Sequence, residues 1–173
     1  VSKRLVYGVG TRLITSHGSG ALNGVYKLVG IENRDGDWTP AIKISEDPGK
    51  VPLPGRKAVW RLYDQRGAAV VDLIGLADEQ PLADEVTVVH HPSHDGINQV
   101  IRRADISHIE LLHDTVFSED IDATSTPTID ELAVPCRVDV HRLDTGLRRL
   151  GNPHRYHVRL TSKFYRLRKT LSP

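Results

Sequence analysis

Two runs of strand-forming residues, one on each side of a tight turn, restrict the fold of this chain more than any other feature of its sequence. The runs are residues 58–63 and 68–74, and the turn between them reads Asp64-Gln65-Arg66-Gly67. Glycine stands where a hairpin turn needs a positive φ. We therefore predict an antiparallel hairpin here, and with it a fold that contains a sheet.

Other segments in the first two thirds of the chain also favour strands. Residues 25–31 and 41–45 are predicted to pair as a second hairpin, because the turn-forming run 33–37 lies between them. Residues 86–89 predict one more strand, and residues 106–117 at least one other. A short apolar strand is expected at 5–7, directly before two closely spaced glycines.

The last third of the sequence favours helices. Thr128 and Glu131 form a capping-box pattern, with a hydroxyl at the N-cap and a carboxylate three residues later. Apolar residues then fall on one predicted helix face, at Ile129, Leu132, Cys136, Val140 and Leu143. Pro135 is expected to kink this helix or delay its start. A short strand at 157–160 and a basic helix at 162–171 follow.

Composition argues against several classes of protein. The net charge of +1 is too small to indicate a nucleic-acid or membrane partner. The chain has no apolar run near the roughly 20 residues of a membrane span. Its single cysteine excludes an internal disulfide, which fits a reducing, cytoplasmic location. The chain contains no methionine and begins within a predicted strand, so we expect it to be a segment of a longer protein.

The local pattern most typical of a binding site is Gly8-Val9-Gly10-Thr11. A strand that ends in closely spaced glycines lets backbone N–H groups converge on an anion, and a helix start adds the positive end of its dipole. The Thr11 hydroxyl is expected to complete such a phosphate-binding loop. The alternative is a steric turn without a ligand, since many strand ends turn on glycine.

The remaining reactive residues do not form a catalytic site in the sequence. His90, His91 and His94 are the densest group of histidines, and we interpret them as surface residues at a strand end. Cys136 lies on the apolar face of its helix and is predicted to be a buried structural thiol. Lys27 and Lys43 lie within apolar strand segments and are expected to point to solvent, with contact to an anion as the alternative. The basic residues around the turn at Pro54-Gly55 are expected to form a solvated loop: Lys50, Arg56 and Lys57.

Several ordered motifs resemble nicotinate phosphoribosyltransferases, and together they span nearly the whole chain. The matching motifs are Tyr7-Gly8-Val9-Gly10-Thr11-Arg12-Leu13, Gly24-Val25-Tyr26-Lys27-Leu28-Val29, Ile42-Lys43-Ile44-Ser45-Glu46-Asp47-Pro48, Pro54-Gly55-Arg56-Lys57, Arg61-Leu62-Tyr63-Asp64 with Gly67 and Asp72, and Asn152-Pro153-His154-Arg155-Tyr156. The resemblance is to the C-terminal part of these enzymes.

The resemblance implies an α/β fold of the type II phosphoribosyltransferases, with an α+β character in this part alone. Residues 1–45 are expected to form the edge of an irregular α/β barrel with the phosphate-binding loop. Residues 46–127 would form a β-rich hairpin region, and residues 128–173 a C-terminal helical segment. Gly8, Gly10 and Thr11 match the loop that holds the 5′-phosphate of the ribose in such enzymes.

The resemblance also implies a reaction and its partners. Nicotinate and phosphoribosyl pyrophosphate would give nicotinate mononucleotide and pyrophosphate, with ATP hydrolysis and magnesium, in a homodimeric enzyme of NAD biosynthesis. The family's catalytic histidine and nicotinate-contacting residues belong to an N-terminal portion, so no catalytic or metal-ligating residue is assigned to this chain and it is expected to be inactive alone. Two alternatives remain: a non-catalytic split subunit or remnant that binds a partner protein, and a nicotinamide-specific relative.

Overall fold

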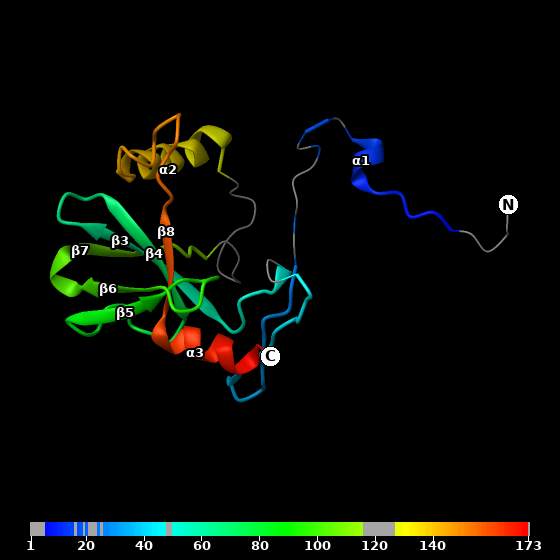
Figure 1. Cartoon of the computed structure of the whole chain (residues 1–173), viewed down its shortest axis with the longest axis horizontal. Helices are drawn as coiled ribbons and strands as arrows, with labels where there is room; N and C mark the ends of the chain where they lie inside the picture. Colours follow the sequence, from blue (N-terminus) through cyan, green and yellow to red (C-terminus); the bar gives the residue numbers. More distant parts are fainter. Residues whose placement is uncertain are drawn as a thin grey trace.

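The computed structural model describes residues 6–15, 17–18, 20, 24, 26–47, 50–115 and 127–172. Figure 1 shows two parts: an N-terminal arm, of which residues 6–15, 17–18, 20, 24 and 26–28 are described, that extends away from the rest, and a folded body, residues 50–115 and 127–172. The arm contains one short helix, α1 (Thr11–Ile14). A small hairpin joins the two parts, with strands β1 (Gly30–Glu32) and β2 (Trp38–Pro40).

The folded body is built on a six-stranded mixed sheet. Its strands are β3 (Lys57–Asp64), β4 (Ala69–Leu76), β5 (Val86–His90), β6 (Asn98–Arg102), β7 (Ile106–Leu111) and β8 (His157–Thr161). Their order across the sheet is β6-β5-β8-β4-β3-β7. The last strand of the chain, β8, therefore lies in the middle, parallel to β4 and antiparallel to β5.

The connection between β6 and β7 explains why the sheet curls. These strands form opposite edges of the sheet, yet only one turn of 3₁₀ helix (Arg103–Asp105) separates them in the chain. Three residues cannot cross a flat six-stranded sheet, since neighbouring strands lie about 4.8 Å apart. The sheet must therefore bend into a half-barrel, and the fold is α+β.

The core lies on the inner face of this half-barrel. Burial alternates along β3 and β4, as expected for strands with one face packed and one face more open. The buried cluster consists of Ala58, Trp60, Leu62, Val71, Leu73, Leu82, Val89, Ile101 and Ile106. Leu62 and Leu73 are completely buried at its centre.

The predicted hairpin at 58–74 is confirmed as β3 and β4. The Asp64 carboxylate accepts hydrogen bonds from the backbone N–H groups of Arg66 (2.9 Å) and Ala68 (3.0 Å). Gly67 has a φ of +77°, which a residue with a Cβ adopts only with strain. The strands predicted at 86–89 and 157–160 are confirmed as β5 and β8, and the region 106–117 contains β7.

The hairpin predicted from residues 25–31 and 41–45 is correct only near its turn. Asn33 accepts hydrogen bonds through its side-chain oxygen from the backbone of Asp35 (2.9 Å) and Asp37 (2.8 Å), which fixes a tight turn. Pairing then begins at once, between β1 and β2, and one further backbone bond, from the Ala41 N–H to the Val29 carbonyl oxygen (2.9 Å), follows the end of β2 at Pro40. Residues 41–45 are not a strand, and Val25 lies outside the described residues.

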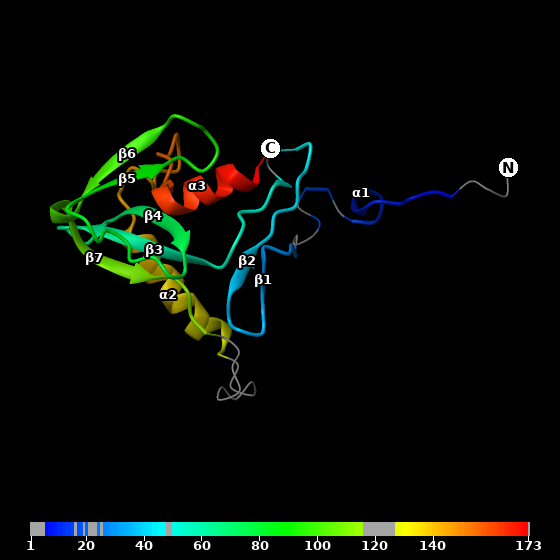
Figure 2. The same cartoon turned by 90° about the horizontal axis from the view of Figure 1, so that it is seen from below.

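Two helices flank the sheet. Figures 1 and 2 show α2 (Ile129–Arg142) and α3 (Ser162–Leu171) on opposite sides of it. The basic helix predicted at 162–171 is confirmed as α3, and its Phe164 is completely buried. None of the helices in the described part of the chain has the length and apolar character that a membrane span requires.

The structure corrects the prediction for α2 in two respects. The capping box of Thr128 and Glu131 is present, and Pro135 neither delays the helix start nor ends the helix. However, Cys136 is exposed and not buried. Ile129, Leu132 and Val140 of the predicted face are also exposed and only Leu143 is half-buried, because periodicity identifies a helix face but does not supply a surface to cover it.

Candidate functional site

The predicted phosphate-binding loop lies in the N-terminal arm, at the start of α1. Gly8 and Gly10 are exposed, and a Cβ added at either glycine would meet no atom within 4 Å. The backbone N–H of Leu13 donates to the carbonyl oxygen of Gly10 (3.1 Å), and Thr11 is the first residue of α1. The expected strand before the loop does not form at Val6 and Tyr7, and Leu5 lies outside the described residues.

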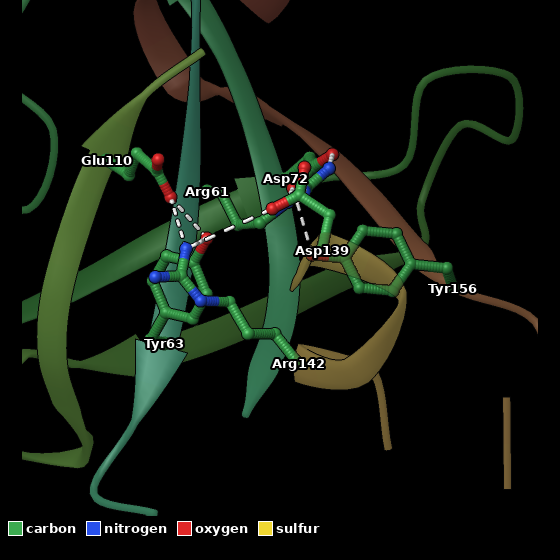
Figure 3. A network of polar contacts seen from close by, with 7 residues as sticks. All are labelled: Arg61, Tyr63, Asp72, Glu110, Asp139, Arg142 and Tyr156. Atoms are coloured by element: carbon green, nitrogen blue, oxygen red, sulfur yellow. Dashed lines mark hydrogen bonds and ion pairs between the residues drawn. The ribbon is translucent and has the colours of Figure 1, made fainter. Parts of the chain in front are cut away.

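A network of charged and phenolic side chains occupies the outer face of the sheet, below α2. Figure 3 shows its members, which come from β3, β4, β7, α2 and the residue before β8: Arg61, Tyr63, Asp72, Glu110, Asp139, Arg142 and Tyr156. Residues far apart in sequence meet here, so the network links α2 to three strands of the sheet.

The ion pair between Arg61 and Asp72 is the centre of this network. Arg61 donates from Nε to one carboxylate oxygen of Asp72 (2.9 Å) and from a terminal nitrogen to the other (3.0 Å). Both side chains are about 15% exposed (16% and 14%), so the bidentate pair is largely desolvated. The third nitrogen of the Arg61 guanidinium donates to the carboxylate of Asp139 on α2 (3.2 Å), and Tyr156 donates its hydroxyl to Asp72 (2.9 Å).

The second half of the network is built around Tyr63. Its hydroxyl donates to the Glu110 carboxylate, and Arg142 of α2 contacts both groups, at 3.3 Å and 3.4 Å. The Arg142 guanidinium also lies over the Tyr63 ring, 5.3 Å from its centre. Burial raises the pKa of Tyr63, and the bond to Glu110 raises it further.

The electrostatics of the network indicate a structural role. Hydrogen bonding to Asp72 raises the pKa of Arg61 above its ordinary value. Burial, then the bond to Asp72, raises the pKa of Tyr156. These shifts keep the guanidinium charged and the phenol protonated, so neither group exchanges a proton near neutral pH. We interpret the network as a clamp between α2 and the sheet.

The histidine group also has structural partners. His90 ends β5, lies 2.9 Å from the hydroxyl of Ser162 and stacks on Tyr165 at 4.2 Å. His91 accepts a hydrogen bond from the backbone of Ser93 (3.0 Å) through Nδ1. Burial lowers the pKa of His91, with smaller contributions from neighbouring cationic groups. Among the described residues, no group of three or more histidine, cysteine or carboxylate side chains could hold a metal ion.

The basic residues divide into exposed ones and one partly buried one. Lys27, Lys43, Lys50 and Arg56 are exposed, as predicted. Lys57 is an exception, because it is only partly exposed and its ammonium donates to the carbonyl oxygens of Leu53 (2.8 Å) and Gly55 (2.7 Å). Burial lowers its pKa.

The network that forms the clamp is not predictable from local sequence patterns. Arg61 and Asp72 appear in the sequence only as parts of a family motif, and Asp139, Arg142 and Tyr156 carry no local signal that links them. The available clue was the hairpin itself, because opposite charges on paired strands often face each other.

A cavity of about 590 Å³ lies where the β1–β2 hairpin meets the folded body. Its lining includes Trp38, Gly55 and Leu167. Arg56 covers the Trp38 ring, with its guanidinium 5.7 Å from the ring centre. The hairpin therefore rests on the body through an aromatic and a cationic side chain.

Comparison with known proteins places the chain in a family. Residues 56–168, more than half of the chain, match the family profile described as the nicotinate phosphoribosyltransferase C-terminal domain. A nicotinate phosphoribosyltransferase from Bacillus subtilis is 35% identical over 157 residues, which cover 90% of this chain and 31% of the relative. One from Bos taurus is 31% identical over 167 residues, which cover 96% of this chain and 30% of the relative.

A solved structure shows the same fold. The crystal structure of human nicotinic acid phosphoribosyltransferase matches 69% of this chain and 23% of its own length, with a TM-score of 0.57 and 24% sequence identity. The chain spans about three tenths of the length of the curated relatives that it matches. On the family match, this chain belongs to the nicotinate phosphoribosyltransferase family and contains its C-terminal domain.

Proposed function

We propose that this chain is the C-terminal part of an enzyme that makes nicotinate mononucleotide. In the proposed reaction the ring nitrogen of nicotinate bonds to C1 of the ribose of phosphoribosyl pyrophosphate, and pyrophosphate leaves. The observation that supports this proposal most directly is the extent of the similarity. Relatives named nicotinate phosphoribosyltransferase match 90–96% of the chain, well beyond the C-terminal domain at 56–168.

The extent of the similarity bears on the phosphate-binding loop as well. An alignment that covers 96% of the chain leaves about seven residues outside, so it includes Gly10 and Thr11. We propose that Gly8, Gly10 and Thr11 bind the 5′-phosphate of the phosphoribosyl group. Both glycines leave the backbone open to an approaching phosphate, because no other atom lies near the position of a Cβ.

Magnesium and ATP belong to the proposal for the complete enzyme. The described residues contain no group of three or more carboxylate, histidine or cysteine side chains that could hold a metal ion. The proposal also includes a homodimeric enzyme and a cytoplasmic location. In this arrangement the chain supplies the phosphate loop, and an N-terminal portion supplies the base-binding and catalytic residues.

Turnover assays test the proposal. Nicotinate, phosphoribosyl pyrophosphate, magnesium and ATP are supplied to this chain alone and to the chain with the N-terminal portion of the enzyme. We expect nicotinate mononucleotide only from the reconstituted protein. A folded, reconstituted protein with no turnover and no affinity for nicotinate mononucleotide would overturn the proposal and favour a non-catalytic scaffold. Turnover of nicotinamide but not nicotinate would identify a nicotinamide-specific relative.

A substitution tests the phosphate loop. Thr11→Val in the reconstituted enzyme removes one hydrogen bond to a charged group, which typically costs about 1.5–3 kcal/mol and so weakens mononucleotide binding about tenfold or more. Thr39→Val, in the exposed β1–β2 hairpin, is the matched control. Equal affinities of the two folded variants would contradict the assigned role of Thr11.

A further inference from the structure

Helix α2 is attached to the sheet mainly by charge and hardly by apolar packing. No side chain of α2 is buried, and only Ala133 and Asp139 are partly buried. Ile129 and Leu132 are 85% and 59% exposed. Most helices in proteins gain their stability by packing an apolar face, and an isolated helix of this length is marginal in water. The sheet, in contrast, has its own buried core.

The charged contacts between α2 and the sheet lie at the C-terminal end of the helix, where the Arg142 guanidinium also covers the Tyr63 ring and Leu143, directly after the helix, forms one parallel bridge with Ala69 of β4. Asp139 pairs with Arg61 (3.2 Å), and Arg142 pairs with Glu110 (3.4 Å) and the Tyr63 hydroxyl (3.3 Å). The side chains of Asp139, Arg142 and Glu110 are 38–45% exposed, so salt ions can reach these pairs.

The other contacts leave the helix loosely seated. A cavity of about 340 Å³ separates α2 from the end of β7, with Leu111, Val134 and Val138 in its lining. Pro135 removes one backbone hydrogen bond from within the helix. The capping box stabilises the helix start through reciprocal hydrogen bonds between Thr128 and Glu131.

We propose that α2 is a releasable cover for the outer face of the sheet, held closed by the Asp139–Arg61 and Arg142–Glu110 ion pairs. When these pairs break, residues 128–142 open as one unit while the six-stranded sheet stays folded. Opening uncovers the outer face of β3 and β7 and frees an apolar helical segment.

Hydrogen exchange measured at low and high salt tests this proposal. Raising the ionic strength from 0.01 M to 1 M shortens the Debye length from about 30 Å to about 3 Å. The backbone amides of α2 should then exchange about three- to tenfold faster, whereas those of β3 and β4 keep their rates. Loss of protection in helix and sheet together, or no effect of salt on α2, would overturn the proposal.

Variants separate the two ion pairs from general surface charge. Asp139→Asn and Arg142→Gln should each raise the exchange rate of α2 at low salt and reduce its dependence on salt. The control is Lys163→Gln on α3, which breaks the exposed ion pair between Lys163 and Asp78. The exchanged pair Glu110→Arg with Arg142→Glu should restore slow exchange. If the exchanged pair does not restore slow exchange of the α2 amides and the single variants exchange like the control, the ion pairs do not hold α2 on the sheet.

Discussion

Removing the charge of Asp72 is expected to destabilise the folded body markedly, because two largely buried donors, Arg61 and Tyr156, depend on this carboxylate as their acceptor. It accepts both hydrogen bonds of the bidentate Arg61 pair and the hydroxyl of Tyr156. In Asp72→Asn the side chain keeps its size but has only one carbonyl oxygen. That oxygen can still accept from Arg61 Nε and from Tyr156, as one oxygen of Asp72 does, but the amide NH2 group then faces the terminal nitrogen of Arg61, which is also a donor. A largely buried guanidinium also loses its main counter-charge.

The magnitude follows from the exposure of the pair. Breaking a fully buried ion pair by removing one partner costs about 3–5 kcal/mol, because the other charge stays uncompensated. Here the two side chains keep 16% and 14% of their exposure, and Asp139 still lies 3.2 Å from Arg61. We therefore expect Asp72→Asn to lower the free energy of unfolding by about 2–3 kcal/mol.

Urea unfolding of the chain, followed by circular dichroism, measures this change. With a slope of about 1–3 kcal/mol per molar urea for a domain of this size, a loss of about 2–3 kcal/mol should lower the midpoint by about 0.7–3 M. The decisive comparison is the apolar replacement Arg61→Met with Asp72→Leu and Tyr156→Phe. Such a replacement removes the three largely buried polar groups together and deprives only Asp139 of its partner, a carboxylate that is 45% exposed and lies 3.9 Å from Arg142, so its stability should lie within about 1 kcal/mol of the parent.

Two results would refute this reasoning. A loss below about 0.5 kcal/mol in Asp72→Asn would place the substitution among ordinary surface changes and show that the pair is effectively solvated. A triple variant as unstable as Asp72→Asn would show that the shape of the side chains matters and not the uncompensated charge.

Three further predictions follow from single residues. Gly67→Ala forces a side chain into a φ of +77° and should lower the free energy of unfolding by about 1 kcal/mol in a urea titration, whereas an unchanged midpoint would exclude strain at this turn. Gly75→Ala places a Cβ 2.8 Å from Thr161 and 2.9 Å from the Trp60 ring, so we expect the free energy of unfolding to fall by about 1–3 kcal/mol and the fluorescence spectrum of Trp60 to shift. A spectrum without a shift would contradict this contact. Because the pKa of Tyr156 is raised, the folded chain keeps a phenol proton that the unfolded chain loses near its ordinary pKa of 10, and this contribution to stability is therefore present below pH 10 and falls as the pH rises above it. Unfolding titrations between pH 8 and 11 should show a shallower fall in stability for Tyr156→Phe than for the parent. Parallel curves for the two proteins would contradict this linkage.

Local chemistry explains which elements were predictable from the sequence. The β3–β4 hairpin and the start of α2 follow from turn and capping residues whose partners lie within four positions, such as Asp64 with Ala68 and Thr128 with Glu131. Strand β6 was missed because its five residues, Asn98–Arg102, mix polar and apolar side chains without a clear boundary. The central place of β8 depends on pairing with β4 across more than 80 residues, which no local pattern encodes.

The candidate site, too, has a part that local sequence patterns predict and a part that they do not. The glycines of the phosphate loop carry a pattern that sequence alone can recognise, and their role stays a prediction for the assembled enzyme. The prediction for Cys136 is wrong because helical spacing identifies a face without showing that the face is buried, and the contacts of this helix with the sheet are made by the charged Asp139 and Arg142.

The irregularity in the ladder between β3 and β4 joins the core of the sheet to the clamp on its outer face. Tyr63 pairs with Ala69, so a regular ladder would place Arg61 opposite Val71. The register shifts between Leu62 and Tyr63, and as a result Leu62 faces Val71 and Arg61 faces Asp72. Because paired residues point to the same side of a sheet, this shift puts two apolar side chains in the core and an ion pair on the outer face. The bulge therefore determines both how the hairpin packs and where α2 finds its counter-charges.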